Sequence, residues 1–74
     1  MQLSARNQFS GQVKEVKLGN IMAEVVVDIG GGHEVVAAIT RGSVERLGLA
    51  QGSTVTVVIK ATEVLIAKDY REPK

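Results

Sequence analysis

The sequence contains no cysteine and only one histidine, His33. Without thiols the chain forms neither disulfide bonds nor thiolate metal sites, and a single histidine excludes a multi-histidine metal site within one chain. Aromatic side chains are also scarce, since Phe9 and Tyr70 are the only two. Proteins that bind single-stranded nucleic acid normally stack bases on aromatic rings. We therefore expect no bare metal cation and no nucleic-acid partner.

Neither sign of charge predominates. Nine lysines and arginines stand against eight aspartates and glutamates, which gives a net charge of +1, and the basic face typical of nucleic-acid binding is not evident. Hydrophobic runs of membrane-spanning length are missing, and the first residues lack the basic and then apolar layout of a signal peptide. The sequence thus predicts a cytoplasmic protein with no membrane partner.

The chain is short, and we interpret residues 1–74 as a single domain whose charged end, 70–74, is frayed. A domain of this size buries only about 60% of the surface that its unfolded chain exposes, so its core is marginal. Small chains gain further stability from disulfides, metals or partner subunits. Because the sequence excludes the first and gives no sign of the second, association with other subunits is the remaining route.

Apolar residues alternate with a period of two over most of the chain, which is typical of β-strands. The clearest alternation covers residues 21–29, and Gly19–Asn20 before it is a hairpin signal because both residues tolerate positive φ. Gly11 indicates a bulge or a sharp bend in the first strand, in which Val13 and Val16 point to opposite faces. The pattern predicts five strands, at residues 9–18, 21–29, 33–40, 54–60 and 63–67.

One segment between the third and fourth strands is helical. Ser43 is a good N-cap and Gly48 a good C′ residue, so we expect one helical turn over residues 43–47. Five strands with a short helix in this position follow the order of an OB-type barrel. We therefore predict an all-β fold, a five-stranded OB-like barrel, with a simple meander sandwich as the competing topology.

The strand faces opposite the predicted core are unusually apolar. A sheet that faces water carries polar side chains on its outer face. One interpretation is that the strand register is misassigned, and the other, which we favour, is burial by a second subunit. The residues concerned are Met22, Val26, Val36, Val58 and Leu65.

Three short clusters, at residues 4–7, 40–43 and 60–62, combine hydroxyls with a fixed positive charge. A tetrahedral oxyanion carries two negative charges on oxygens that only accept, so a dry site for it needs N–H and O–H donors and cations. The clusters contain no carboxylate. Each alone has an ordinary structural explanation, as a helix cap, a solvated lysine or a polar terminus. The functional interpretation requires the clusters to converge.

The order of motifs along the chain is more specific than any one cluster. This order resembles the Mop family of molybdate-binding domains, which is TOBE-like, and the resemblance extends from Ser4 to about Asp69. A chain with one such domain is similar to a molbindin, a free-standing molybdenum-binding protein. The motifs are Ser4-Ala5-Arg6-Asn7, Gly11, Gly19-Asn20, Ala23-Glu24-Val25, Ile39-Thr40 with Ser43, Leu47-Gly48-Leu49, and Ile59-Lys60-Ala61-Thr62 with Val64.

The resemblance implies a hexamer, a trimer of dimers, that binds molybdate or tungstate between subunits. It implies that the Ser4-Ala5-Arg6-Asn7 segment comes from one chain and that the threonine, serine and lysine segments come from a neighbour. The implied oxyanion-binding residues are Ser4, Ala5, Arg6, Asn7, Thr40, Ser43, Lys60, Ala61 and Thr62.

The family also has oxyanion sites near its threefold axes. Glycine-rich turns form anion-binding nests, but we favour the simpler explanation that these glycines form hairpin turns and that His33 is an exposed strand start. The residues that we match to a second site are Lys17, Gly19, Asn20, Gly31, Gly32 and His33.

The function implied is reversible binding and storage of molybdate or tungstate in the cytoplasm, for molybdenum homeostasis. We expect no enzyme activity, because no nucleophile has an evident base and no Ser–His–carboxylate set is recognisable. One alternative is a molybdate-sensing adaptor that acts through protein contacts. A second alternative, an OB-type nucleic-acid-binding protein, is disfavoured by the few aromatics and balanced charge.

Overall fold

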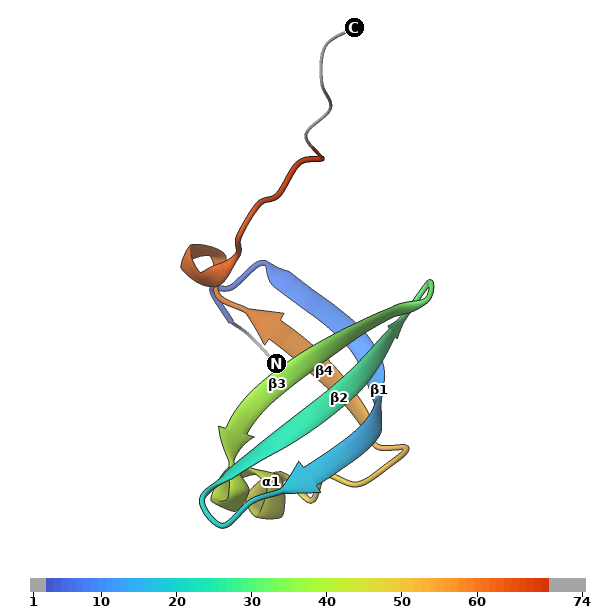
Figure 1. Ribbon diagram of the computed structural model, residues 1–74, viewed down its shortest axis with the longest axis vertical. Helices are drawn as coiled ribbons and strands as arrows, with labels where there is room; N and C mark the ends of the chain where they lie inside the picture. Colours follow the sequence, from blue (N-terminus) through green and yellow to red (C-terminus); the bar gives the residue numbers. More distant parts are fainter. Residues whose placement is uncertain (1–2, 70–74) are drawn as a thin grey trace, which may run out of the picture.

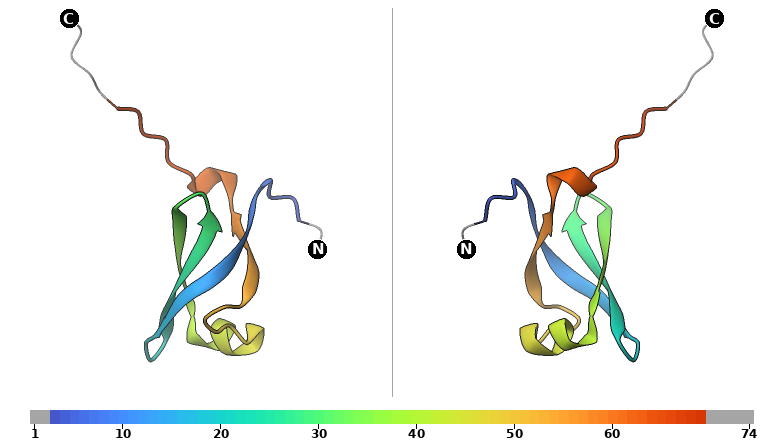
Figure 2. Two further views of the ribbon diagram at one scale, coloured as in Figure 1. Left: turned by 90° about the vertical axis from the view of Figure 1, so that its right-hand side faces the viewer. Right: turned by 90° about the vertical axis from the view of Figure 1, so that its left-hand side faces the viewer.

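The computed structural model of the protein describes residues 3–69. Tyr70 and the charged end predicted to be frayed, 70–74, lie outside the described residues. Figures 1 and 2 show a small curled sheet with a short helix at one end and an extended segment leaving the other. The elements are β1 (Asn7–Leu18), β2 (Met22–Gly30), β3 (His33–Thr40), α1 (Arg41–Leu47), β4 (Thr54–Ile59) and the 3-10 helix η1 (Ala61–Glu63).

A single antiparallel sheet has the order β3-β2-β1-β4. The long strand β1 joins two halves, because its first part pairs with β4 and its second part pairs with β2. Gln12 belongs to both ladders, opposite Asp28 on one side and Thr54 on the other. The mostly-β fold with one short helix is confirmed, and β3 begins and ends at the predicted residues.

The fifth strand, predicted at residues 63–67, is not part of this sheet. After β4 the chain makes the η1 turn and then runs away from the sheet through residues 64–69, which have no regular secondary structure (Figure 1). Leu65 and Ile66 are 94% and 90% exposed. Among residues 3–69 the sheet therefore has four strands, and the five-stranded barrel is not formed within the chain. We name residues 64–69 the arm.

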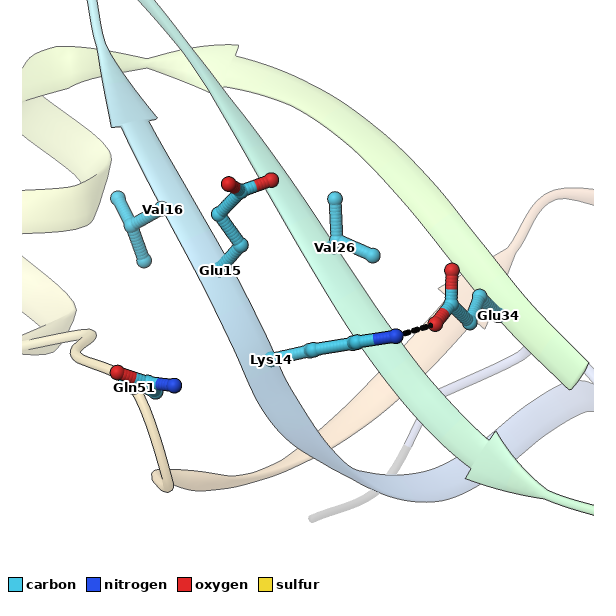
Figure 3. Close-up of a pocket in the computed structure, with 6 residues that line it drawn as sticks. All are labelled: Lys14, Glu15, Val16, Val26, Glu34 and Gln51. Atoms are coloured by element: carbon cyan, nitrogen blue, oxygen red, sulfur yellow. Dashed lines mark hydrogen bonds and ion pairs between the residues drawn. The ribbon is translucent and has the colours of Figure 1, made fainter. Parts of the chain in front are cut away.

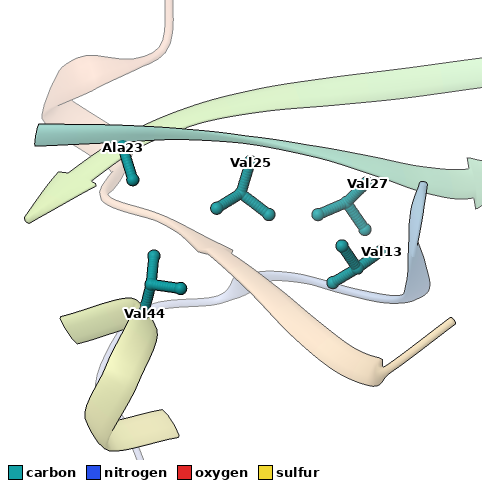
Figure 4. Close-up of a cluster of buried hydrophobic side chains, with 5 residues drawn as sticks. All are labelled: Val13, Ala23, Val25, Val27 and Val44. Carbon is teal, nitrogen blue, oxygen red and sulfur yellow. The ribbon is translucent and has the colours of Figure 1, made fainter. Parts of the chain in front are cut away.

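The core lies between the curled sheet and α1. Its buried members are valines and an alanine from β1, β2 and α1, drawn in Figure 4. The three from β2 alternate along the strand, as the period-two pattern predicts. Val44 closes one end of this cluster from α1. The buried core is Val13, Ala23, Val25, Val27 and Val44.

A bulge in β1 makes its side chains face differently from the prediction. The register shifts between Val13 and Glu15, so that Lys14 is the extra residue. As a result Val13 pairs with Val27 and Val16 with Val25, both buried residues of β2. The prediction that Val13 and Val16 point to opposite faces is therefore wrong, because the extra residue at the bulge turns both side chains to the inner face.

At two glycines the backbone passes so close to other atoms that a side chain would not fit. A Cβ at Gly11 would lie 2.6 Å from the carbonyl oxygen of Asp28 and 2.7 Å from a methyl carbon of Val27. Gly11 is therefore required by the close approach of β1 to β2, and the predicted bulge falls at Lys14 instead of at Gly11. At Gly19 a Cβ would lie 2.7 Å from the Met22 carbonyl oxygen. The hairpin predicted at Gly19–Asn20 is confirmed, because β1 and β2 pair antiparallel on either side of it. Neither Gly19 nor Asn20 has positive φ, so the reason given for the turn is wrong.

The helix begins earlier than predicted. Thr40, and not Ser43, is the N-cap of α1, since its Oγ1 accepts the N–H of Ser43. Gly48 ends the helix with φ of 62°, as expected. In the part of the chain from residue 3 to 69, no helix is long and apolar enough to cross a membrane.

Of the five apolar residues that the sequence placed on the outer face, Met22, Val26, Val36 and Val58 lie in strands of the sheet, whereas Leu65 lies in the arm. Val26 and Val36 are directly paired across β2 and β3. Val36 is 61% exposed and Met22 48% exposed, so this face is open to solvent in the single chain.

Candidate functional site

The first and third polar clusters meet at one end of the sheet. Asn7, the first residue of β1, pairs with Ile59, the last residue of β4. The Asn7 side-chain Nδ2 also donates to the Ile59 carbonyl oxygen at 3.2 Å. Arg6 precedes this pair and Lys60 follows it, so the pair brings the two cations of the predicted site to the same end of the molecule.

The N-terminal segment is shaped by a further side chain. Gln8 Nε2 donates to the Ala5 carbonyl oxygen at 2.6 Å. Ser4 and Arg6 are exposed, whereas Ala5 and Asn7 are half-buried. The segment therefore holds a defined turn on the end of β1, with its charged and hydroxyl groups open to solvent.

The lysine cluster forms the turn between β4 and the arm. Lys60 is the N-cap residue of η1, and its carbonyl oxygen accepts the N–H of Glu63 at 2.8 Å. Lys60, Ala61 and Thr62 are all exposed. Glu63 brings one carboxylate to this end, next to the donors predicted to bind an anion.

The middle cluster lies at the start of α1. Thr40 Oγ1 donates to Ser43 Oγ at 2.8 Å and accepts the Ser43 N–H at 3.1 Å. Arg46, three residues further along the helix, donates from Nη2 to Ser43 Oγ at 3.2 Å. The cluster thus combines two hydroxyls with a guanidinium.

The two ends are separated by the length of β1. Thr40 pairs with Met22 beside the last residues of β1, where Leu18 pairs with Ala23. The Asn7–Ile59 pair stands at the first residue of the same 12-residue strand. Figure 1 shows α1 at one end and the N-terminal segment with η1 at the other. One chain therefore brings together two of the three predicted clusters, and the third faces away.

The residues matched to a second oxyanion site lie at two separate turns. Gly19 and Asn20 connect β1 to β2, where Arg41 Nη1 donates to the Gly19 carbonyl oxygen at 3.3 Å. Lys17, near this turn, pairs with Glu15 at 3.8 Å. Gly31, Gly32 and His33 lie at the other end of β2.

At the glycine turn, a carboxylate already occupies a backbone donor. The Gly30 N–H donates to Asp28 Oδ1 at 2.8 Å, and residues 30–32 all have positive φ. Positive φ explains these glycines as hairpin residues. The Asp28 carboxylate would oppose an anion at this turn.

A groove on the outer face lies away from all three clusters. It measures about 530 Å³ and is crossed by an ion pair between Lys14 and Glu34, which reaches over β2 (Figure 3). The hydrogen bond to Glu34 raises the pKa of the exposed Lys14. Among residues 3–69 no three acidic, cysteine or histidine side chains are grouped to hold a metal ion.

Two polar residues beside the clusters were missed by the sequence reasoning. Arg46 lies at the i+3 helical spacing from Ser43, and that spacing is a signal visible in the sequence. Gln8 follows the Ser4-Ala5-Arg6-Asn7 motif directly, but no sequence pattern indicates that its amide turns back to Ala5.

The chain is similar to known molybdenum-binding proteins. The TOBE domain family matches residues 3–66. Molybdenum-pterin-binding protein 1 of Clostridium pasteurianum is 48% identical over 66 residues, covering 89% of this chain and 97% of that protein. The structure of a molybdate-binding protein from Sporomusa ovata superposes with a TM-score of 0.86 at 46% identity, over 92% of this chain and 100% of that one.

A longer relative has been solved with its ligand. The cytoplasmic molybdate-binding protein ModG, in a form with molybdate bound, has a TM-score of 0.79 at 41% identity. The match covers 82% of this chain and 43% of ModG. The family match over most of the sequence, the high identity to full-length relatives and the agreement of fold together establish that this chain belongs to the TOBE domain family.

Proposed function

We propose that the protein binds molybdate or tungstate reversibly and stores it in the cytoplasm, at sites formed between subunits, as a part of molybdenum homeostasis. Its relatives carry molybdenum-binding names, and the solved neighbours are molybdate-binding proteins. The role is binding without catalysis. The observation that carries the proposal is the Asn7–Ile59 pair, which sets Arg6 and Lys60 at one end of the sheet.

The chemistry of this end suits a tetrahedral dianion. Arg6 and Lys60 supply positive charge, and Ser4, Asn7 and Thr62 supply polar hydrogens near main-chain N–H groups. Molybdate oxygens lie farther from the central atom than sulfate oxygens, so cavity size distinguishes the two. Phosphate carries a proton near neutral pH and needs an acceptor. We propose that the Glu63 carboxylate stays outside the site, so that only donors face the anion.

The oxyanion is enclosed by two chains. Thr40 and Ser43 stand at the end of the sheet opposite Arg6 and Lys60, so these groups converge only when the α1 end of one subunit meets the other end of a neighbour. This division groups Lys60, Ala61 and Thr62 with the Ser4-Ala5-Arg6-Asn7 segment, instead of with Thr40 as the resemblance alone implied. Such a contact joins unlike surfaces, and it closes only as a ring.

A second contact follows from the open side of the sheet. Strands β3 and β4 are its edges, and the side chains between them line an apolar cavity of about 240 Å³ that includes Val25, Ile39 and Val57. The arm carries exposed apolar side chains and leaves its own sheet. We propose that the arm of a second copy pairs along these edges as the fifth strand and closes the barrel.

These two contacts give the proposed hexamer. Exchange of arms between two copies is a twofold, self-complementary contact, and the end-to-end contact forms a ring of three. Together they make a trimer of dimers. The apolar outer face around Val26 and Val36 supplies further surface for burial in this assembly.

Calorimetric titration tests the binding function. The wild-type protein, at a mass measured in the same buffer, is titrated with molybdate, tungstate, sulfate and phosphate. We expect molybdate and tungstate to bind and compete, and sulfate and phosphate to bind far more weakly. Arg6→Ala and Lys60→Ala each lose about 10- to 100-fold in affinity, because each removes a charge-assisted hydrogen bond. Lys14→Ala on the outer face is the control and binds as wild type.

Thermal unfolding provides an independent check. A ligand bound only to the folded assembly stabilises it by mass action. Saturating molybdate therefore raises the melting temperature of the wild-type protein, and it raises that of Arg6→Ala much less. Absence of both heat and thermal shift at every molybdate concentration contradicts the proposed function.

A further inference from the structure

Two side-chain amides at the Arg6–Lys60 end bind main-chain carbonyls. Gln8 donates to the Ala5 carbonyl at 2.6 Å, and Asn7 donates to the Ile59 carbonyl at 3.2 Å. Each of these carbonyls belongs to the peptide unit that contains the N–H of the next residue, Arg6 in the first case and Lys60 in the second. The two amides therefore act on the peptide units of the two cationic residues.

Peptide geometry gives this arrangement a consequence. All peptide bonds among residues 3–69 are trans, and in a trans peptide the C=O and the N–H point in opposite directions. When Gln8 holds the Ala5 carbonyl toward β1, the Arg6 N–H is turned to the other side. Without this bond nothing fixes the peptide unit in that orientation, and the opposite orientation would turn the Ala5 carbonyl oxygen to the side of the donors, where it would repel an oxyanion.

We propose that Gln8 is a positioning residue of the oxyanion site, which orients the Arg6 N–H as a donor and masks the Ala5 carbonyl as an acceptor. This inference rests on the proposed function and adds to it a residue that determines specificity. Asn7 makes the equivalent bond to Ile59, so its side chain also acts through the backbone and not only as a direct ligand.

Masking a carbonyl has different effects on the affinities for molybdate and for phosphate. Molybdate at neutral pH offers only acceptors, so a free carbonyl in the site weakens its binding. Hydrogen phosphate offers one O–H, which a free carbonyl accepts. Removing the Gln8 amide therefore lowers molybdate affinity while leaving phosphate affinity unchanged or increased, and the ratio of the two affinities falls.

The test uses Gln8→Met, which keeps the length of the side chain and removes the donor. Gln12→Met is the matched control, an exposed glutamine in the middle of the same strand. Each full-length variant is titrated with molybdate and with inorganic phosphate, and its mass and melting temperature are measured. We expect Gln8→Met to lose about 3- to 10-fold in molybdate affinity, the range of one hydrogen bond, and Gln12→Met to match wild type.

Gln8→Glu provides a second variant, in case Gln8→Met assembles poorly. At neutral pH its carboxylate neither donates to the Ala5 carbonyl nor tolerates a nearby anion, so molybdate affinity falls further than in Gln8→Met, while phosphate falls as well. Because the Ala5 carbonyl is unmasked in both variants, the ratio of molybdate to phosphate affinity decreases in Gln8→Glu as well as in Gln8→Met. An unchanged ratio in either variant that assembles like wild type overturns carbonyl masking.

The possible failures are distinguishable. If wild type binds molybdate through Arg6 and Lys60 but Gln8→Met binds both anions as wild type does, the inference on Gln8 is overturned and the proposed function stands. An equal loss for both anions overturns the masking argument. If wild type binds no molybdate, both the inference and the proposed function are wrong.

Discussion

The two sides of the sheet differ in how far one chain completes them. On the side of β2, the inward valines are buried between β1, β2 and α1, with Val25 and Val27 each 3% exposed. On the side of β4, Val55 and Val57 have the same alternation but stay half-buried, because they face the open edge between β3 and β4. Identical side-chain chemistry thus produces a closed core on one side and an unfinished one on the other. The proposed arm exchange would account for this difference, because the arm of a second copy would cover Val55 and Val57.

The largest expected effect comes from disabling the arm. Leu65→Asp combined with Ile66→Asp places charges where we expect burial in a partner barrel, and burying an unpaired charge is prohibitive. The double variant loses the assembly and runs at the mass of a single chain or a ring of three in native mass spectrometry. Lys68→Asp changes the charge of the arm without touching its apolar residues and keeps the wild-type mass. A hexamer in the double variant contradicts arm exchange.

The close approach of Gly11 to β2 gives the next largest effect. Gly11→Ala forces a methyl group to within 2.6 Å of the Asp28 carbonyl oxygen, and strain of this kind costs about 1–3 kcal/mol. Urea unfolding measures the loss. Gly42→Ala is the control, because nothing lies within 4 Å of its added Cβ. We expect the Gly42 variant to be as stable as wild type or slightly more stable.

A double-mutant comparison measures the difference between the two sides. Val13→Ala, at a buried residue that does not line the cavity between β3 and β4, removes buried methyl groups and costs about 2 kcal/mol in any background. Val57→Ala costs a similar amount in the wild-type protein, where a partner arm covers it, but much less in the Leu65→Asp, Ile66→Asp background. Chemical denaturation of the four variants yields the coupling energy. Equal costs for Val57→Ala in both backgrounds show that the arm does not cover this side.

The smallest effect belongs to the ion pair on the outer face. Glu34 raises the pKa of Lys14 in the folded state, so the pair stabilises the fold below the ordinary lysine pKa. That contribution disappears as pH rises through the raised pKa. Lys14→Met is therefore slightly less stable than wild type near neutral pH and equal to it at strongly alkaline pH. Unfolding curves at both pH values test the sign, and Lys68→Met is the control.

Sequence periodicity predicted the parts of the fold that one chain completes. The alternation through β2 and β3 identified the inward residues, because these two strands pair with each other along their length in an antiparallel ladder. The bulge at Lys14 was not predictable, since a lysine carries no signal for an extra residue in a strand. The fifth strand was predicted from the same alternation that succeeded elsewhere. Its residues alternate as in a strand but run away from their own sheet. The local sequence pattern of a strand does not indicate which other strand it pairs with.

The candidate site, like the fold, was predictable only where local sequence decides the structure. The motifs identified residues able to bind an oxyanion, but their placement depends on long-range register. Only the Asn7–Ile59 pair, 52 positions apart in the chain, places Lys60 beside Arg6. The capping role of Thr40 is local, but the prediction assigned it to Ser43, three residues too late, because the last strand residue was not considered as a cap.

The length of β1 sets the spacing between the donor groups of each chain. Its first residue holds the Arg6 end and its last residues support the α1 end. Deleting one residue from this strand would shorten the distance between neighbouring anions in a ring by about 3.3 Å and turn its following side chains to the opposite face. Homologues with an altered β1 would therefore need a compensating shift elsewhere, and the anion-to-anion spacing should be among the most invariant dimensions of such rings.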